Sequence, residues 1–282
     1  MLTAIVITVT PVAEVTGPAF TGRAVQAWFL NQVRAADPEL SARIHAGDAT
    51  RPYTVSDLVG AGPIRAGRRQ LSPERQGWLR ITALTPELSG VLLEQIVPAL
   101  PGAQLDLGGP VVRVDGVATQ PSEHRWAGQA SPQALLVSHS LAPGDSRRLS
   151  MRFASATTFR SQGRNIPFPL PELVFGSLVN KWNEFMPVAL HPDARRFAEE
   201  RIVASKYKLR SKYVQFGPDD RGAAVGAVGA CRYHVQSGDR YWTSVIRALA
   251  AFAFFAGVGA RTTVGLGQAT LWDEEARVPA GF

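Results

Sequence analysis

The feature that most constrains this chain is a glycine-rich stretch at residues 257–267, with the sequence GVGARTTVGLG. Four glycines in eleven residues indicate a backbone that turns sharply and lets another group come close. An apolar segment over residues 240–256 predicts a helix that runs into this stretch, and residues 268–272 predict a strand that leaves it. The chain must therefore fold so that a tight loop joins a helix to a strand near its C-terminus.

This loop differs from the two common nucleotide-binding loops. It contains no Gly-Lys-Ser/Thr, so it is not a Walker loop. Dinucleotide loops open a helix whose N-terminus attracts phosphate, whereas here a helix C-terminus of the opposite partial charge enters the loop. A bound anion would be held by loop N–H groups and Arg261, which suits a polyanion lying across the loop. A plain connector is an equally good interpretation of the spacing alone. The candidate contact residues are Gly259, Arg261, Thr262 and Thr263.

The charge balance favours a polyanionic partner. Thirty Lys and Arg residues against twenty-three Asp and Glu residues give a net charge of +7, which favours nucleic acid over a membrane surface. The single cysteine, Cys231, excludes an internal disulfide framework and fits a reducing compartment. The longest apolar run, residues 248–256, has nine residues, whereas a membrane helix needs about twenty. We therefore expect a soluble, cytoplasmic protein with no membrane segment.

Hydrophobic periodicity predicts the order strand, helix, strand, strand, helix, strand in the first half of the chain. Thr21 is the expected N-cap of the first helix, Pro38 is expected to end it, and Pro86 stands in the first turn of the second helix. Residues 60–75, rich in Gly, Pro and Arg, are predicted to form a loop. The expected elements are strand 2–10, helix 21–36, a short strand at 42–45 with a second piece at 53–58, strand 78–84, helix 86–97 and strand 111–117.

The same order is predicted again after a segment rich in Pro and Gly. We therefore predict an α+β fold of two tandem ferredoxin-like (βαββαβ, RRM-like) domains. They cover residues 1–120 and 146–282, and the linker at 121–145 includes a short helix near 131–137. Element order alone, without a residue-level repeat, supports the duplication. The expected elements of the second half are strand 149–159, a helix from Pro171, strands 201–213 and 223–235, helix 240–256 capped by Asp239, and strand 268–272.

Two groups of cations are candidate RNA contacts. Lys206, Lys208, Arg210 and Lys212 alternate with other residues, so a strand places all four on one face. Such charges can protect an edge strand from pairing with another chain, or they can form a track for a phosphate backbone. With the overall positive charge, we favour the track. Arg160 and Arg164, in a polar loop, are further candidates for phosphate contacts.

The residues with catalytic potential are few. None of the five histidines stands in HExxH or HxH spacing, no Gly-x-Ser-x-Gly occurs, and no cluster of carboxylates suggests a two-metal nuclease. What remains is a general acid or base, and histidine is suited to this near neutral pH. His45 is the best placed, at the end of the predicted short strand and near Arg51 and Tyr53. A structural role is the default interpretation of an isolated histidine.

Three further segments carry a family resemblance: IH at 44–45 with RPYTVS at 51–56, TTFR at 157–160, and residues 169–183. Together with the glycine-rich loop and the apolar helix before it, they resemble the repeat-associated RAMP superfamily. Within it, they are similar to the CRISPR-associated endoribonuclease that processes precursor CRISPR RNA. The resemblance spans nearly the whole chain, and the glycine motif is its specific part. It implies two ferredoxin-like domains facing each other, RNA bound over the cleft and basic surfaces, and metal-independent cutting within each repeat, without a cofactor.

The resemblance also implies a mechanism. The ribose 2′-hydroxyl attacks the adjacent phosphorus and leaves a 2′,3′-cyclic phosphate and a 5′-hydroxyl. His45 matches the histidine that many members place after the first helix, and Arg51 stands at the position of a common lysine. Arg51 can hold the scissile phosphate but does not titrate near neutrality. The first helix offers no tyrosine, so Tyr53 is the candidate hydrogen-bond donor in its place.

Two other functions stay open at this point. A non-catalytic RNA-binding subunit of an RNA-guided CRISPR effector complex would use the same fold and loop. A self-assembling scaffold with incidental positive charge would have negligible RNA affinity at moderate salt. The expected partners are CRISPR repeat RNA or crRNA and, in the first alternative, other effector subunits. We expect no metal and no cofactor, and either a monomer or a homodimer.

Overall fold

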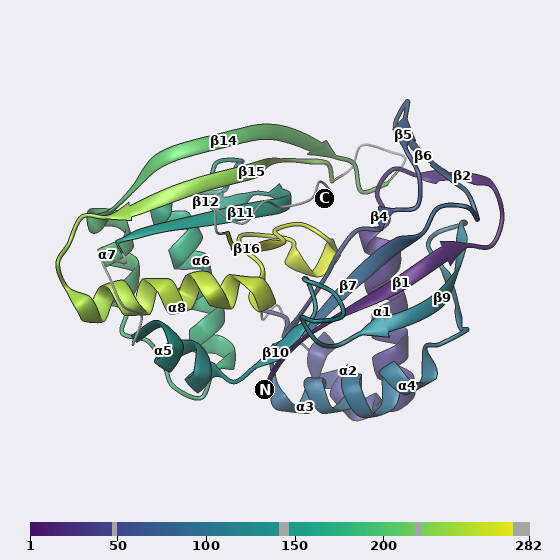
Figure 1. Ribbon diagram of the computed structural model, residues 1–282, viewed down its shortest axis with the longest axis horizontal. Coiled ribbons are helices and arrows are strands. Elements are labelled where there is room, and N and C mark those ends of the chain that lie inside the picture. The colour runs from purple at the N-terminus through teal and green to yellow at the C-terminus, as the bar shows by residue number, and fades with distance from the viewer. Residues whose placement is uncertain (47–49, 141–146, 218–221, 273–282) are drawn as a thin grey trace. The chain divides into compact units, whose positions relative to one another are not determined.

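The structure is a computed structural model that describes residues 1–46, 50–140, 147–217 and 222–272 (Figure 1). The chain divides into two compact units. The first contains Met1–Gln129 together with Thr263–Gly265, and the second contains Ala130–Thr262 and the described residues from Leu266 onward. Among the described residues, no helix combines the length and the apolarity that crossing a membrane requires.

The first unit is built on an antiparallel sheet in the order β3-β7-β1-β9-β8, with β4 beside β7 and β10 beside β1. Its four strands β9-β1-β7-β3 have the order of a ferredoxin-like fold, as predicted. The elements are β1 (Leu2–Pro11), β2 (Val15–Pro18), α1 (Gly22–Ala36), α2 (Pro38–His45), β3 (Tyr53–Val55), β4 (Val59–Gly60), β5 (Ile64–Arg65), β6 (Arg68–Leu71), β7 (Gly77–Ala83), α3 (Pro86–Gly90), the π-helix η1 (Val91–Ile96), α4 (Val97–Ala99), β8 (Gln104–Asp106), β9 (Val111–Ala118) and β10 (Gly128–Ala130).

The core of this unit lies between the sheet and the helices. Alternate residues of β1, Ile5, Ile7 and Val9, are fully buried on one face of the sheet. Phe29 of α1 and Leu92 of η1 belong to the same buried cluster. The 3.6-residue period of the helices and the two-residue period of the strand therefore bring their apolar sides together, as the sequence predicts.

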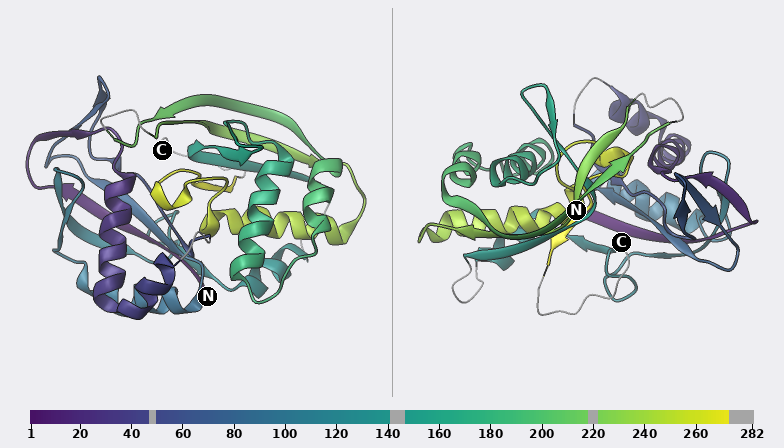
Figure 2. Two further views of the ribbon diagram at one scale, coloured as in Figure 1. Left: turned by 180° about the vertical axis from the view of Figure 1, so that it is seen from behind. Right: turned by 90° about the horizontal axis from the view of Figure 1, so that it is seen from above.

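The second unit repeats this topology with a sheet in the order β14-β15-β11-β16, all antiparallel. Helices α6 and α8 cover the same face of the sheet (Figures 1 and 2). The elements are α5 (Pro132–Ser140), β11 (Arg148–Thr157), β12 (Phe159–Ser161), β13 (Arg164–Ile166), α6 (Pro171–Phe185), α7 (Asp193–Arg201), β14 (Ile202–Val214), β15 (Ala224–Val235), α8 (Arg240–Ala256) and β16 (Ala269–Leu271). The 3-10 helix η2 (Thr262–Val264) begins in this unit at Thr262, and its other two residues belong to the first unit. The described part of the predicted linker contains β10 and α5, and the short helix expected there is confirmed by α5.

The caps explain where the two main helices of this unit begin and end. Pro171 occupies the first turn of α6, where a missing N–H does no harm. The Asp239 side chain accepts a hydrogen bond from the Trp242 N–H at 3.2 Å, which caps α8 as predicted. At the other end of α8, Gly257 adopts a positive φ of 61° and stops the helix.

The predicted strand at residues 42–45 is wrong, because this segment is the end of helix α2. Pro38 does not close α1 but opens α2, where it occupies the first turn. The Asp37 side chain accepts a hydrogen bond from the Leu40 N–H at 2.8 Å and so caps the new helix. Leu40 and Ile44, four residues apart, are both buried on its inner side. The Asp-Pro pair thus starts one helix directly after another.

The predicted loop at residues 60–75 is also wrong in part. Its described residues include β5 and β6, which form a three-stranded sheet in the order β2-β6-β5. Thr16 pairs with Gln70 across this sheet, more than fifty positions away in the chain. The helix α7 and the strand β8 were not predicted either. Such short elements depend on distant pairing and packing, which local sequence patterns do not show.

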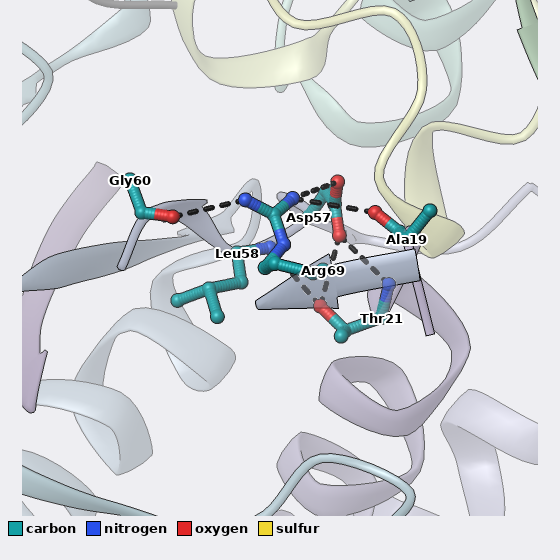
Figure 3. Close-up of polar contacts among 6 residues, drawn as sticks. All are labelled: Ala19, Thr21, Asp57, Leu58, Gly60 and Arg69. Atoms are coloured by element: carbon teal, nitrogen blue, oxygen red, sulfur yellow. Dashed lines mark hydrogen bonds and ion pairs between the residues drawn. The ribbon is translucent and has the colours of Figure 1, made fainter. Parts of the chain in front are cut away.

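A buried ionic network connects β6 to the start of α1 (Figure 3). The Asp57 carboxylate accepts hydrogen bonds from the Thr21 N–H at 2.7 Å and the Thr21 hydroxyl at 2.8 Å. The guanidinium of Arg69 lies 3.3 Å from the same carboxylate and donates to the carbonyls of Gly60 and Ala19. Asp57 and Arg69 are 9% and 5% exposed. Thr21 stands at the N-cap position as predicted, but the negative charge at this helix N-terminus comes from Asp57.

Replacing Asp57 with alanine should destabilise the first unit strongly. The substitution leaves the Arg69 charge buried without its carboxylate, which typically costs about 3–5 kcal/mol. Urea unfolding of the full chain, followed by tryptophan fluorescence, measures the loss. The control is Arg113→Ala, which removes a pair with Asp115 whose arginine side chain is 58% exposed and should cost less than about 1 kcal/mol. Equal stability of the two variants would contradict the role assigned to Asp57.

Candidate nucleic-acid interface and catalytic site

His45 is the last residue of α2 and is exposed. Its Nδ1 lies 2.7 Å from the backbone carbonyl oxygen of Ser41. Since a carbonyl only accepts, Nδ1 must carry the proton in this bond. A neutral imidazole with this tautomer presents the lone pair of Nε2, the atom that could take a proton from a bound hydroxyl. The helix therefore orients the ring through its own backbone.

Arg51 lies beside His45 and binds the end of the same helix. Its guanidinium donates to the carbonyl of Ile44, to that of Ala46 at 3.2 Å and to that of His45 at 3.5 Å. A cation at a helix C-terminus neutralises the partial negative charge of the unpaired carbonyls. Arg51 thus holds the backbone that carries His45. The planar guanidinium of Arg51 has five N–H donors in all.

Tyr53 lies in the core, although it follows Arg51 by only two positions. Its side chain is 2% exposed and packs edge-on against Phe29 with 5.3 Å between the ring centroids. Its hydroxyl accepts a hydrogen bond from Gln26 Nε2 at 2.9 Å. Burial raises the pKa of Tyr53, so the hydroxyl stays protonated at neutral pH. Of the three predicted catalytic residues, the structure brings His45 and Arg51 together and places Tyr53 in the interior.

Most N–H groups at the start of the glycine-rich loop bond within the protein. The N–H groups of Val258 and Ala260 donate to the carbonyls of Gly267 and Thr158, both at 2.8 Å. The Gly259 N–H donates to the Ser177 hydroxyl at 2.8 Å. A Cβ on Gly259 would lie 2.3 Å from the Thr158 carbonyl oxygen, so no side chain fits at this position. These N–H groups stabilise the loop rather than forming an open anion site.

Arg261 and Thr262 also take part in contacts inside the second unit. The Arg261 guanidinium donates to the Gly222 carbonyl at 2.9 Å and stacks over the Phe216 ring, 4.6 Å from its centroid. Thr262 is buried, whereas Thr263 is half-buried and belongs to the first unit. The predicted RNA contacts at Gly259, Arg261, Thr262 and Thr263 stay predictions.

Lys181 of α6 is a buried cation that the sequence analysis missed. Its ammonium donates to the carbonyls of Ala256 and Gly257 at 2.9 and 3.2 Å and to the Thr262 hydroxyl at 3.2 Å. It therefore caps the C-terminus of α8 from another helix and holds the first turn of the loop. A lysine three residues after Leu178, on the apolar stripe of a predicted helix, was the signal available in the sequence.

The four cations of β14 lie as predicted on one face of an exposed edge strand. Lys206 pairs with Arg232 and Lys208 with Ala230 of β15, and Ala230 in turn pairs with Arg152 of β11. Because paired residues share a face, Arg152 and Arg232 join the cations of β14. The buried neighbours of Arg152, Met151 and Phe153, point to the opposite face, against the helices. The cationic surface therefore extends beyond β14. Its residues are Arg152, Lys206, Lys208, Arg210, Lys212 and Arg232.

Arg160 and Arg164 lie on a separate hairpin of β12 and β13 and are exposed. The turn between them uses Gln162 and Gly163, both with positive φ, as in a type I′ hairpin. In the described part of the chain, no three His, Cys, Asp or Glu side chains gather in a way that could hold a metal ion. The expected absence of a metal stays a prediction.

Two family models match most of the sequence. The model described as the CRISPR Cas6 N-terminal domain matches residues 1–136, and that of the CRISPR-associated endoribonuclease Cas6 matches residues 151–269. The chain belongs to the Cas6 family. This confirms the resemblance drawn from the glycine-rich loop and the segments around His45.

Relatives and solved structures of the Cas6 family agree with this result. The CRISPR-associated endoribonuclease Cas6 of Mycobacterium tuberculosis is 26% identical over 231 residues, which cover 67% of this chain and 71% of the relative. A structure described as a Cas6 product complex is 27% identical and covers 96% of this chain and 100% of its own, with a TM-score of 0.79. Thermus thermophilus Cas6 is 25% identical, with coverages of 96% and 98% and a TM-score of 0.70. The predicted fold of two ferredoxin-like domains is confirmed.

The buried amine of Lys181 predicts a pH-dependent stability. Burial lowers the pKa of Lys181 to about 7, whereas an unfolded lysine has a pKa of about 10.4. Above pH 7 the unfolded chain thus binds more protons, and the free energy of unfolding should rise with pH by up to about 1.4 kcal/mol per unit. Urea unfolding between pH 6.5 and 8 measures this slope. Lys181→Met should lose it, and equal slopes in both proteins would show that Lys181 keeps its proton.

Proposed function

We propose that this protein is an endoribonuclease that cuts precursor CRISPR RNA within its repeats. The observation that carries the proposal is an exposed histidine, His45, whose ring and backbone are both held at the end of α2, beside Arg51. Relatives named as endoribonucleases, and similar structures described as product and substrate-mimic complexes, support RNA as the substrate. A histidine-to-alanine variant of one relative is also among the similar structures.

The proposed reaction is an internal transfer at phosphorus. The ribose O2′ forms a bond to the adjacent phosphorus while the bond from phosphorus to O5′ breaks. The 2′-hydroxyl loses its proton, and the leaving O5′ gains one. The products are a 2′,3′-cyclic phosphate and a 5′-hydroxyl. This reaction needs aligned oxygens, a proton acceptor or donor and a cation for the extra negative charge, and it needs no metal.

We assign proton transfer and phosphate binding to different residues. His45 serves as the general acid or base through Nε2, because Nδ1 is committed to the Ser41 carbonyl. Arg51 holds the scissile phosphate with guanidinium N–H groups while it binds the end of α2. Tyr53 is buried, so its part in this proposal is to support β3 beside Arg51. We assign the second proton transfer to water.

In this proposal, the cationic surface binds the phosphates of the RNA. Its six cations lie on three neighbouring strands and suit the phosphates of one RNA molecule. Phosphate contacts release counterions, so affinity should fall steeply as the salt concentration rises. The exposed hairpin with Arg160 and Arg164 adds further positive charge in the same unit.

His45→Ala should lower the cleavage rate by about 10²–10⁴-fold and leave RNA affinity unchanged, because the imidazole moves protons and does not anchor the RNA. The measurement is single-turnover cleavage of end-labelled repeat RNA in EDTA, with the ends of the products identified enzymatically. His191→Ala, at another exposed histidine, is the matched control and should cleave normally. Full activity of His45→Ala would remove this residue from the mechanism. Intact RNA with the unaltered protein would favour a non-catalytic RNA-binding subunit.

A further inference from the structure

The sheet of the first unit has a face that points away from its helices. Leu79 and Ile81 of β7 belong to the buried cluster that packs against the helices. Trp78 and Arg80 alternate with them and therefore point to the opposite face. Domains of the RRM type use this face of their sheet to stack aromatic side chains on RNA bases. In this chain, however, Arg80 is only 1% exposed, so another segment must cover it.

Residues 119–127, which we call the strap, lie over this face. The guanidinium carbon of Arg80 is 5.3 Å from the centroid of the Trp126 ring, and Arg80 Nε donates to the Trp126 carbonyl at 2.8 Å. Trp126 and Ala127 are 3% and 1% exposed. Strand β10 follows directly and pairs with β1 (Figure 1). The strap thus places an indole of the protein itself on the face that an RRM offers to RNA.

Two side chains of the strap close its turns by accepting backbone hydrogen bonds. The Glu123 carboxylate accepts from the N–H groups of Thr119 and Gln120 at 2.7 and 3.0 Å. The Nδ1 atom of His124 accepts from the Trp126 N–H at 3.1 Å. Nδ1 must therefore carry no proton in this bond, and the neutral ring has its proton on Nε2. A second proton, at Nδ1, would turn the acceptor into a donor that faces another donor.

The surroundings of His124 oppose this second proton. Its ring packs against the Trp78 ring with 5.0 Å between the centroids. Burial and the charges of Arg125 and Arg80 lower the pKa of His124. Arg125 belongs to the strap and Arg80 to β7, so both segments beside the ring present a cation. The one carboxylate of the strap, on Glu123, accepts its hydrogen bonds from the first turn.

A second histidine makes the same local bond in the opposite electrostatic setting. The Nδ1 atom of His191 accepts from the Asp193 N–H at 3.2 Å, again two residues along the chain. The Asp193 carboxylate also lies 3.6 Å from this nitrogen, so a proton there meets a negative charge. The local bond alone therefore does not oppose protonation. What distinguishes His124 is that its neighbours are cations and an indole.

We propose that His124 is a pH-sensitive latch, which holds the strap over Trp78 and Arg80 when the ring is neutral and lets it open more often when the ring gains a proton. The sign follows from proton linkage. A histidine in the open strap has a pKa of about 6.5, and the closed strap lowers that pKa, so the open form binds the proton more tightly. Closure is therefore fully supported above about pH 6.5 and weakens as the pH falls below this value.

Hydrogen exchange of the full chain, followed by mass spectrometry of peptides from the strap, tests this proposal. Between pH 7.5 and 5.5 the protection of the strap amides, corrected for the intrinsic effect of pH on exchange, should fall about fivefold, the effect of losing one hydrogen bond. His124→Asn should keep the protection constant, because an asparagine side chain also accepts from the N–H two residues along and does not titrate. His191→Asn, at the other histidine with this bond, is the matched control and should leave the fall unchanged.

Two outcomes of this experiment would overturn the proposal. One is constant protection of the strap in the unaltered protein between pH 7.5 and 5.5. The other is an equal fall in His124→Asn, because another group would then cause it. If His124→Asn does not fold, titration of His124 in the unaltered protein by NMR decides, and a pKa at or above that of a free histidine would refute the latch. None of these measurements uses RNA, so failure here is distinct from failure of the proposed nuclease activity.

Discussion

The second unit depends on a place where backbone packs directly against backbone. A Cβ at Gly267 would lie 2.2 Å from the carbonyl oxygen of Val258, and Gly259 is pressed equally closely against Thr158. Both glycines also have positive φ angles, which other residues adopt at a cost. The glycine-rich loop is therefore a close-packed joint between α8 and β16. Steric constraints within the protein already require its glycines, without any contact with a ligand.

This joint creates an electrostatic problem that Lys181 solves. The C-terminus of α8 carries unpaired carbonyls and a partial negative charge, which would repel the phosphates of an RNA molecule. Lys181 donates to two of these carbonyls from the neighbouring helix α6. Arg261, in the same loop, donates to the Gly222 carbonyl and stacks on Phe216. Side chains of the second unit itself thus bind the carbonyls at the end of α8 and hold the loop that follows.

The sequence predicted the long elements well, because β1, α1, α6 and α8 each repeat their apolar residues over at least ten positions. The prediction failed where one residue type is compatible with two different local structures. Pro38 can end a helix or begin one, and the Asp37 side chain decides for the second. The cations of β14 follow from alternation within one strand, whereas Arg152 and Arg232 join them only through the register of β14, β15 and β11. Register between distant strands cannot be read from local pattern.

The candidate catalytic residues show the same limit on a smaller scale. Arg51 and Tyr53 stand two apart and would share a face if both lay in one strand. Arg51 precedes β3 and turns back onto the end of α2, whereas Tyr53 begins β3 and enters the core. The structure therefore places Arg51 beside His45 and the Tyr53 side chain in the core. What brings Arg51 to His45 is the set of unpaired carbonyls at a helix end, a feature that appears only once α2 is known to be a helix.

The cations of β14 had two interpretations, protection of an edge strand and binding of RNA, and their distribution separates them. Protection requires charge only on the edge, because inner strands have no free hydrogen-bonding groups to offer. Arg232 lies on β15 and Arg152 on β11, both inner strands of the sheet. Protection of the edge strand therefore does not account for Arg152 and Arg232. A phosphate backbone lying across the three strands would contact the cations of all of them, so the distribution favours the proposed RNA binding.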